Sequence, residues 1–173
     1  MANTKKYILT GVILGSIAAV AAGLIAVTNL VTEKKIIENE QNKINAGIKD
    51  IFGENSLVKE EKDLDNNKYT VHYYEVNNSS DEFLGYAFKC EGSNMYGKIS
   101  LIAGFDATSH NFMSLYLVKN EQTYASTLVE NYITPLNAND RKLDEVNCGA
   151  TYGAKLVRDM VNEASLVANG LWK

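Results

Sequence analysis

Cysteine, histidine and proline are scarce in this 173-residue sequence, which has two Cys, two His and one Pro. Two cysteines are too few for a disulfide framework in a domain of this size, and Cys90 and Cys148 lack C-x-x-C spacing, which excludes a zinc ribbon and a thioredoxin-type site. Whether these two thiols pair with each other is left open. His72 and His110 lack the i, i+4 partner that a helical metal site needs. The absence of G-x-S-x-G, P-loop and G-x-G-x-x-G motifs leaves a classical hydrolase or nucleotide-binding fold without support.

Basic side chains are also scarce once the N-terminal segment is set aside. The whole chain has a net charge of −4, and residues 1–31 hold Lys5 and Lys6 but no acid. The remainder therefore keeps 15 of the 17 basic side chains against 21 acidic ones, a net charge of −6. A domain this acidic lacks the basic stripe that neutralises phosphates, so we expect no nucleic-acid partner. The same charge argues against adhesion to an anionic lipid surface.

One long stretch contains no charged residue at all, from Tyr7 to Val31. It exceeds the ~20 residues that cross the hydrocarbon core of a bilayer. A signal peptide is the alternative, but its apolar region usually has only ~7–15 residues before a small-residue cleavage site. Here only Ala26-Val27-Thr28 faintly resembles such a site. The sequence therefore predicts a retained, single-pass membrane anchor.

The charges that flank the anchor bear on its orientation. Lys5 and Lys6 lie on one side, and Lys34 and Lys35 lie on the other. Nearby acids count little in the positive-inside rule. With the terminal amine, the balance leans slightly toward a cytoplasmic N-terminus, which would place the C-terminal domain outside the cytoplasm.

Small residues recur at every fourth position of the anchor, namely Gly11, Gly15, Ala19 and Gly23. They would form one stripe on which another transmembrane helix could pack closely. Small residues are also common in such helices without any partner, so both interpretations stay open. If the stripe is a packing surface, the anchor docks into a larger membrane assembly.

The extramembrane chain predicts an α+β domain. Residues 32–52 read as a helix with an isoleucine stripe, and Gly53 stands where a C-terminal cap belongs. Aromatic and β-branched runs predict four strands, whose short connections imply antiparallel neighbours. Those strands are Tyr69–Val76, Phe83–Cys90, Lys98–Phe105 and Phe112–Lys119. The polar stretch Lys59–Lys68 reads as a loop, and Glu91–Asn94 reads as a turn.

Two further helices are predicted, over Thr123–Tyr132 and Ala150–Asn169, with a loop through Pro135 between them. Helices that pack on an antiparallel sheet make an α+β fold. The expected organisation is an N-terminal region with the anchor over residues 1–31, a juxtamembrane amphipathic helix over 32–56 and a domain over 57–173.

The segment Cys148-Gly149-Ala150-Thr151 lies at the start of the last predicted helix. The free N–H groups and the dipole of a helix start favour an anion such as phosphate there. Gly149 permits a close backbone approach, and the hydroxyl of Thr151 could form a phosphoester. The alternative is that Thr151 is an ordinary helix N-cap, which is common for threonine.

Several short motifs occur in order along the chain and together carry a resemblance. They follow the anchor and its juxtamembrane helix, and they are Gly85-Tyr86-Ala87-Phe88, Met95-Tyr96-Gly97-Lys98-Ile99, Ala103-Gly104-Phe105-Asp106 and Cys148-Gly149-Ala150-Thr151. This order resembles the FMN-binding domain family, and within it the G subunit of Rnf electron-transport complexes and the C subunit of the sodium-pumping NADH:quinone reductase. In that family the segment reads Asp-x-x-Ser/Thr-Gly-Ala-Thr. Here Glu145 takes the place of the Asp and Cys148 that of the Ser/Thr.

The resemblance implies that Thr151 carries FMN through its phosphate, attached by a separate flavin transferase. Backbone contacts would come from Gly149, Ala150 and Tyr152. The family's flavin-holding loop corresponds to a reduced stretch here, from Glu121 through Thr123 to Ser126. A tyrosine, either Tyr124 or Tyr152, could stack on the flavin ring, or both could pack in the core.

Three functions are compatible with the sequence. The first is a flavinylated electron-transfer subunit of a membrane redox complex that moves ions, with other membrane subunits as partners. A stand-alone extracellular flavoprotein is a variant of it. The second is the same fold without flavin, as a structural or binding subunit. The third is an unrelated anchored ectodomain, in which Thr151 would cap a helix far from any cleft.

Overall fold

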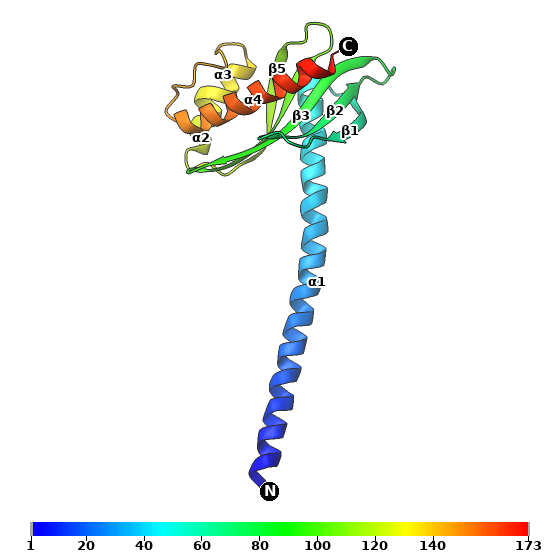
Figure 1. Ribbon diagram of the computed structural model, residues 1–173, viewed down its shortest axis with the longest axis vertical. Helices are drawn as coiled ribbons and strands as arrows, with labels where there is room; N and C mark the ends of the chain where they lie inside the picture. The colour runs from blue at the N-terminus through cyan, green and yellow to red at the C-terminus, as the bar shows by residue number, and fades with distance from the viewer. Residues whose placement is uncertain (1, 173) are drawn as a thin grey trace. The chain divides into compact units, whose positions relative to one another are not determined.

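The computed structural model describes residues 2–172, with side chains described for residues 7–29 and 32–172. The chain divides into two compact units, Met1–Gln41 and Asn42–Lys173. Helix α1 (Ala2–Phe52) contributes to both units (Figure 1).

The first unit is a helical segment whose apolar side chains, where the structure describes them, are all exposed. Every described side chain from residue 7 to residue 29 is exposed, and a Cβ built at Gly11, Gly15 or Gly23 would meet no atom within 4 Å. The hydroxyl of Ser16 donates to a carbonyl of its own helix, 2.8 Å away. In the described part of the chain, α1 is the one helix long and apolar enough to cross a membrane. The side chains of Lys5 and Lys6, which carry the orientation prediction, lie outside those described.

The predicted helix over residues 32–52 is the C-terminal part of α1 rather than a separate element. Gly53 follows the helix with a φ of +98°, and its N–H donates to the carbonyl of Lys49 at 2.8 Å. The C-terminal cap is therefore where the sequence indicated. The predicted domain boundaries after residues 31 and 56 remain predictions, whereas the compact units separate after Gln41.

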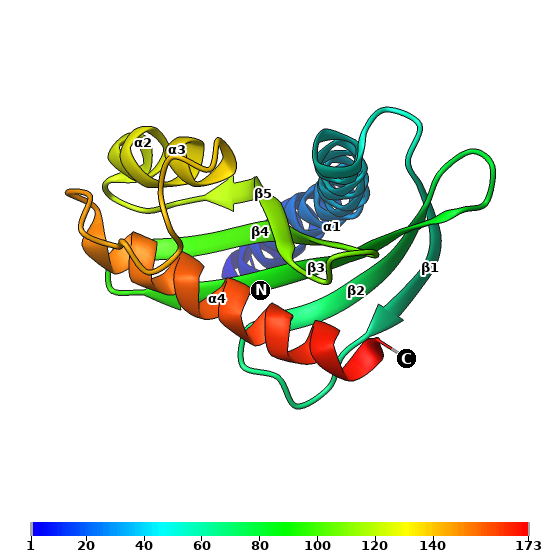
Figure 2. The ribbon, with the colours of Figure 1, turned by 90° about the horizontal axis from the view of Figure 1, so that it is seen from above.

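The second unit is built on a five-stranded antiparallel sheet in the order β1-β2-β3-β4-β5. The strands are β1 (Leu57–Asp63), β2 (Thr70–Asn77), β3 (Phe83–Asn94), β4 (Gly97–Asp106) and β5 (Phe112–Asn120). The α+β class and the four predicted strands are confirmed. Helices cover both faces, so that the sheet is the middle of three layers (Figure 2).

Most of strand β1 lies in the stretch Lys59–Lys68, which the sequence predicted to be a loop. All its residues are exposed and most are charged, so it shows no alternation of apolar and polar side chains. It is an edge strand held by pairing with β2, in which Lys62 lies opposite Tyr73. Charged side chains commonly protect such an edge from pairing with another chain. They also remove the alternating apolar pattern by which a strand is predicted from sequence.

Strand β3 runs straight through the predicted turn at Glu91–Asn94. Gly92 pairs with Ile99 in the β3–β4 ladder. A Cβ on Gly92 would lie 2.5 Å from Cε of Met160, so this glycine marks the close approach of a helix and not a turn. The hairpin reverses at Met95 and Tyr96 instead.

The two faces of the sheet carry separate apolar cores. Helix α4 (Thr151–Leu171) lies across one face and buries Leu156, Val157 and Met160 against it. On the other face, Ile44 and Ile48 from the last turns of α1 pack against the sheet. Figure 2 shows the two helices on opposite sides. Cys90 and Cys148 are both free and buried in the first core, so the open question of their pairing is answered.

The predicted loop through Pro135 is helical. A short α-helix, α2 (Ala125–Leu128), continues into a π-helical turn, η1 (Val129–Ile133), and then into α3 (Thr134–Asn137). Pro135 stands in the first turn of α3, directly after the π-helical turn η1. The side chain of Asn137 then donates to the carbonyl of Leu115 and accepts from its N–H, at 2.7 and 3.0 Å, which satisfies the free edge of β5.

Candidate functional site at the start of α4

The backbone turns sharply into α4 at Gly149. This residue has a φ of +85°, a left-handed conformation that favours glycine. Ala150 follows as the N-cap and supplies no side-chain bond. Thr151 is the first helical residue, so the interpretation of Thr151 as the N-cap is wrong.

Three backbone N–H groups at this helix start are free. The first intrahelical bond runs from the N–H of Ala154 to the carbonyl of Ala150, at 3.0 Å. The N–H groups of Thr151, Tyr152 and Gly153 therefore have no helical acceptor. Together with the positive end of the helix dipole, they favour an anion at this place.

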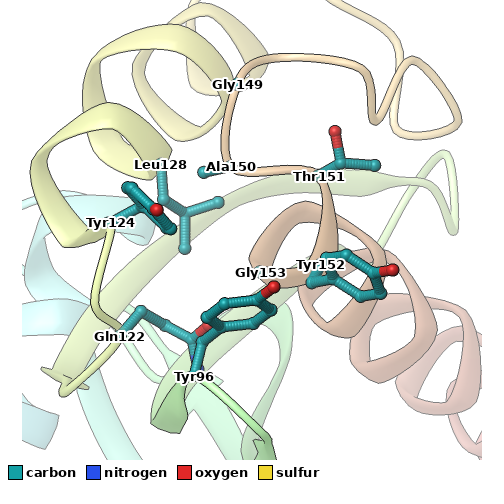
Figure 3. Close-up of a pocket in the computed structure, with 9 residues that line it drawn as sticks. All are labelled: Tyr96, Gln122, Tyr124, Leu128, Gly149, Ala150, Thr151, Tyr152 and Gly153. Atoms are coloured by element: carbon teal, nitrogen blue, oxygen red, sulfur yellow. The ribbon is translucent and has the colours of Figure 1, made fainter.

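A pocket of about 250 Å³ opens beside these N–H groups (Figure 3). It is assembled from the tip of the β3–β4 hairpin, the segment that leads into α2, and the start of α4. The residues that line it are Tyr96, Gln122, Tyr124, Leu128, Gly149, Ala150, Thr151, Tyr152 and Gly153. None of these described lining residues has a charged side chain. The pocket therefore suits a largely uncharged group, with an anion at the adjacent helix start.

Aromatic rings dominate the mouth of the pocket. The ring of Tyr96 lies between two others, with centroids 5.3 Å from Tyr152 and 6.0 Å from Tyr124. Tyr124 and Tyr152 keep 54% and 58% of their surface exposed. The alternative that these two tyrosines pack in the core is therefore wrong, and their ring faces are available for stacking.

The hairpin tip is tied to the helix start by side-chain amides. The Nδ2 group of Asn94 donates to the carbonyl of Tyr152 at 3.1 Å, and its Oδ1 accepts from the N–H of Tyr96 at 2.8 Å. Gln122 is buried, and its Nε2 donates to the carbonyl of Gly97. These bonds hold the walls of the pocket in place.

The hydroxyl of Thr151 is the reactive group that the sequence singles out. The side chain is half-buried, and none of the described residues hydrogen-bonds to its hydroxyl. In Figure 3 this oxygen points away from the three tyrosine rings. Lys155 lies one turn later on the same helix face, with Nζ 5.9 Å from the centroid of the Tyr152 ring. A positive charge is therefore available near an anion attached to Thr151.

Four of the predicted site residues line the pocket, namely Gly149, Ala150, Thr151 and Tyr152. Three others lie beside it. Cys148 is buried, and its carbonyl accepts from Nδ2 of Asn131 at 3.1 Å. Thr123 donates through its hydroxyl to the carbonyl of Tyr96 at 3.3 Å, which makes it a support of the hairpin tip. Glu121 forms an exposed ion pair with Lys119 at 2.7 Å.

Tyr96, Gln122 and Leu128 are pocket residues that sequence reasoning did not single out. Tyr96 and Gln122 belong to stretches that carry the family resemblance, but neither has a local feature that indicates a site. Leu128 has no such signal at all, because an apolar residue in a helical pattern predicts a core position.

Fold and site together define a class: a single apolar helix joined to a small α+β domain, with a neutral aromatic pocket at a helix start. Residues 1–51 match the family model described as the RnfG N-terminal region. No curated protein matches the chain. The chain thus resembles the RnfG subunit family, and the match supports a membrane-associated subunit of the Rnf type. The matched residues are those of α1, so the pocket in the second unit stands on its own geometry.

Proposed function

We propose that this protein is a membrane-anchored electron-transfer subunit that carries FMN covalently on Thr151. Its partners are the other membrane subunits of an ion-translocating redox complex of the Rnf or sodium-pumping NADH:quinone reductase type. Bound there, FMN would accept and pass on one or two electrons. In this arrangement the second unit lies outside the cytoplasm, where covalent attachment prevents loss of the cofactor.

One observation carries the proposal: a threonine hydroxyl without a bonding partner lies at an uncapped helix start, next to an aromatic pocket. An ordinary capping threonine would use that hydroxyl for its own helix. The pocket volume of about 250 Å³ lies just below the ~300–1,000 Å³ typical of ligand sites. On this proposal the pocket holds only the flavin ring system, while the ribityl phosphate lies outside it at Thr151.

The outward direction of the hydroxyl is compatible with this assignment. Threonine in a helix uses two side-chain rotamers, so the oxygen can turn toward the pocket. The five-carbon ribityl chain would link a phosphate on Thr151 to a ring inside the pocket. The phosphoester would keep one negative charge, which the free N–H groups of Tyr152 and Gly153 and the charge of Lys155 would stabilise.

Attachment requires an activated donor. With a flavin dinucleotide as donor, the oxygen of Thr151 bonds to the phosphorus of the FMN half, the hydroxyl proton leaves, and AMP departs as the pyrophosphate bond breaks. The flavin transferase supplies this reaction. On this proposal the acidic domain contributes the acceptor hydroxyl and the place where the product is held.

Intact-protein mass spectrometry after co-expression with a flavin transferase tests the proposal. The wild-type chain should gain the mass of one FMN group, and its flavin should remain bound after denaturation. Thr151→Ala should lose both, whereas Thr151→Ser should keep attachment because it retains the hydroxyl. Thr108→Ala, at an exposed turn threonine, is the matched control and should be flavinylated normally. Flavin mass on Thr151→Ala would refute the assignment.

The second candidate is a structural or binding subunit of the same complex without flavin. It is favoured by the departures from the family motif at Glu145 and Cys148. It would be supported by an unmodified wild-type chain that still co-purifies with other membrane subunits. A flavinylated chain that purifies alone would instead point to a stand-alone flavoprotein.

A further inference from the structure

The side-chain amide of Gln122 has a defined orientation inside the pocket wall. Gln122 is only 7% exposed, and its amide faces the carbonyl of Gly97. A carbonyl can only accept, so the nitrogen of the amide must lie on that side and the oxygen must lie on the other. The oxygen is directed toward the start of α4, where Oε1 lies 3.4 Å from the Cβ position of Gly153.

Among the described residues no hydrogen bond to this oxygen is found, and the oxygen is not enclosed by protein atoms, because Gln122 lines the pocket. The hydrogen bonds of Gln122 use its backbone N–H, which donates to Oδ1 of Asn120 at 3.1 Å, its backbone carbonyl, which accepts from the N–H of Ala125 at 3.1 Å, and its Nε2. An acceptor that faces a pocket is bonded either to water or to a ligand group that replaces this water. Since Gln122 lines the pocket, its oxygen is placed to meet an N–H group of whatever occupies that space.

We propose that Oε1 of Gln122 accepts the ring N–H of the flavin, while the ring of Tyr96 supplies the flat surface on which the heterocycle lies. This inference rests on the proposed function and adds an orientation to it. An oxidised flavin has a single ring N–H, which lies between two carbonyls in its pyrimidine portion. The pyrimidine end is therefore held inside the pocket, next to Gln122.

The opposite, dimethylbenzene edge is then turned toward the mouth, where Tyr124 and Tyr152 are exposed. Electrons would enter and leave across this open edge. The same arrangement makes the site selective for heterocycles with an imide-type N–H. Gln122 does not take part in attachment, so it is a positioning residue for the ring.

The test uses the flavinylated full-length chain in detergent and follows the alkaline ionisation of the ring N–H in the visible absorption spectrum. A hydrogen bond to Oε1 stabilises the protonated ring. The ionisation constant of the wild-type flavin should thus be about tenfold lower than that of free FMN, which raises the pH midpoint by about one unit. Gln122→Met keeps the length of the side chain but removes the acceptor, so its midpoint should fall back toward that of free FMN.

Gln122→Glu provides a second variant whose effect has the opposite sign. At alkaline pH it places a negative charge beside the ionising N–H and should raise the midpoint above that of the wild type. Gln41→Met, at an exposed position of α1, should leave the midpoint unchanged. General loosening of the pocket would move the midpoint of both Gln122 variants in the same direction, so it cannot explain opposite shifts. If one variant folds poorly, the direction of the shift in the other still tests the proposal.

Two failures can be told apart. If FMN is attached but the midpoint equals that of free FMN, or does not change in either Gln122 variant, the role of Gln122 is overturned while attachment to Thr151 stands. If the wild-type chain gains no FMN mass, the proposed function fails and this inference fails with it.

Discussion

Glu163 on α4 should contribute strongly to the stability of the second unit. Its carboxylate accepts three backbone N–H groups from the start of β2: Tyr69 at 2.7 Å, Thr70 at 2.8 Å and Lys68 at 3.2 Å. Thr70 is only 1% exposed, so its N–H has no water to replace the carboxylate. These bonds join α4 to the loop between β1 and β2.

The magnitude follows from the two short bonds. Hydrogen bonds to charged groups contribute about 1.5–3 kcal/mol each. Glu163 is half-buried and glutamine keeps one acceptor oxygen, so we discount the sum and expect Glu163→Gln to cost about 2 kcal/mol. With a denaturant slope of about 2 kcal/mol/M in urea, the unfolding midpoint should fall by about 1 M.

The pH dependence of this loss provides a second check. Burial alone would raise the pKa of Glu163, but the N–H groups of Tyr69 and Thr70 outweigh it, so that the pKa lies below its ordinary value of 4.5. Because the pKa of Glu163 is lowered in the folded state, its carboxylate contributes fully to the free energy of unfolding above about pH 4.5. This contribution is lost as the pH falls through the folded-state pKa. The stability difference between wild type and Glu163→Gln should therefore shrink in acid.

Urea unfolding of the full chain in detergent, followed by fluorescence, measures both effects. The single tryptophan, Trp172, packs against Tyr86 with ring centroids 4.7 Å apart and reports on the end of α4. Glu130→Gln, at an exposed position on η1, is the matched control and should change the midpoint little. The reasoning would be refuted by equal losses in the two variants, or by a Glu163 effect that is independent of pH.

Two other predictions concern the site and its core. Gly149→Ala and Gly53→Ala both force a left-handed backbone on alanine and should each cost about 1–2 kcal/mol. Only Gly149→Ala should also reduce FMN attachment in a mass-spectrometric assay, because Gly53 lies away from the pocket; equal flavinylation of the two variants would count against the helix start as the site. Burial raises the pKa of the Cys90 thiol to about 12, so in a Cys148→Ala background Cys90 should resist maleimide at pH 8 until the protein is unfolded. Rapid labelling of the folded chain would show that the core opens there.

Local patterns were sufficient for the elements with a strong physical signature. The charge-free run from Tyr7 to Val31 indicated the membrane helix, and runs of aromatic and β-branched residues indicated β2 to β5. The pattern failed at β1 and at Gly92. In both cases the deciding factor is a neighbour distant in sequence: β2 pairs with a charged edge strand, and the side chain of Met160 on α4 lies close to Gly92.

In the candidate site, too, local sequence patterns predicted some residues, and only the tertiary structure identified the others. The motif at Gly149–Thr151 could be found from sequence because a helix start, a glycine and a hydroxyl are local properties. Tyr96 and Gln122 could not be assigned, because an aromatic side chain and an amide fit many environments equally well. Even the choice between core and surface for Tyr124 and Tyr152 was open before their neighbours were known.

The sequence by itself determined that a membrane helix is followed by an α+β domain, and that a threonine stands at the start of its last helix. Only the tertiary structure decided that the hydroxyl of this threonine does not cap the helix, and that a pocket lies beside the threonine. The physical reason is that a pocket is made of surfaces from segments far apart in the chain. The shape of the pocket, the tyrosines at its mouth and the orientation of the Gln122 amide are set only when the β3–β4 hairpin and α4 pack together.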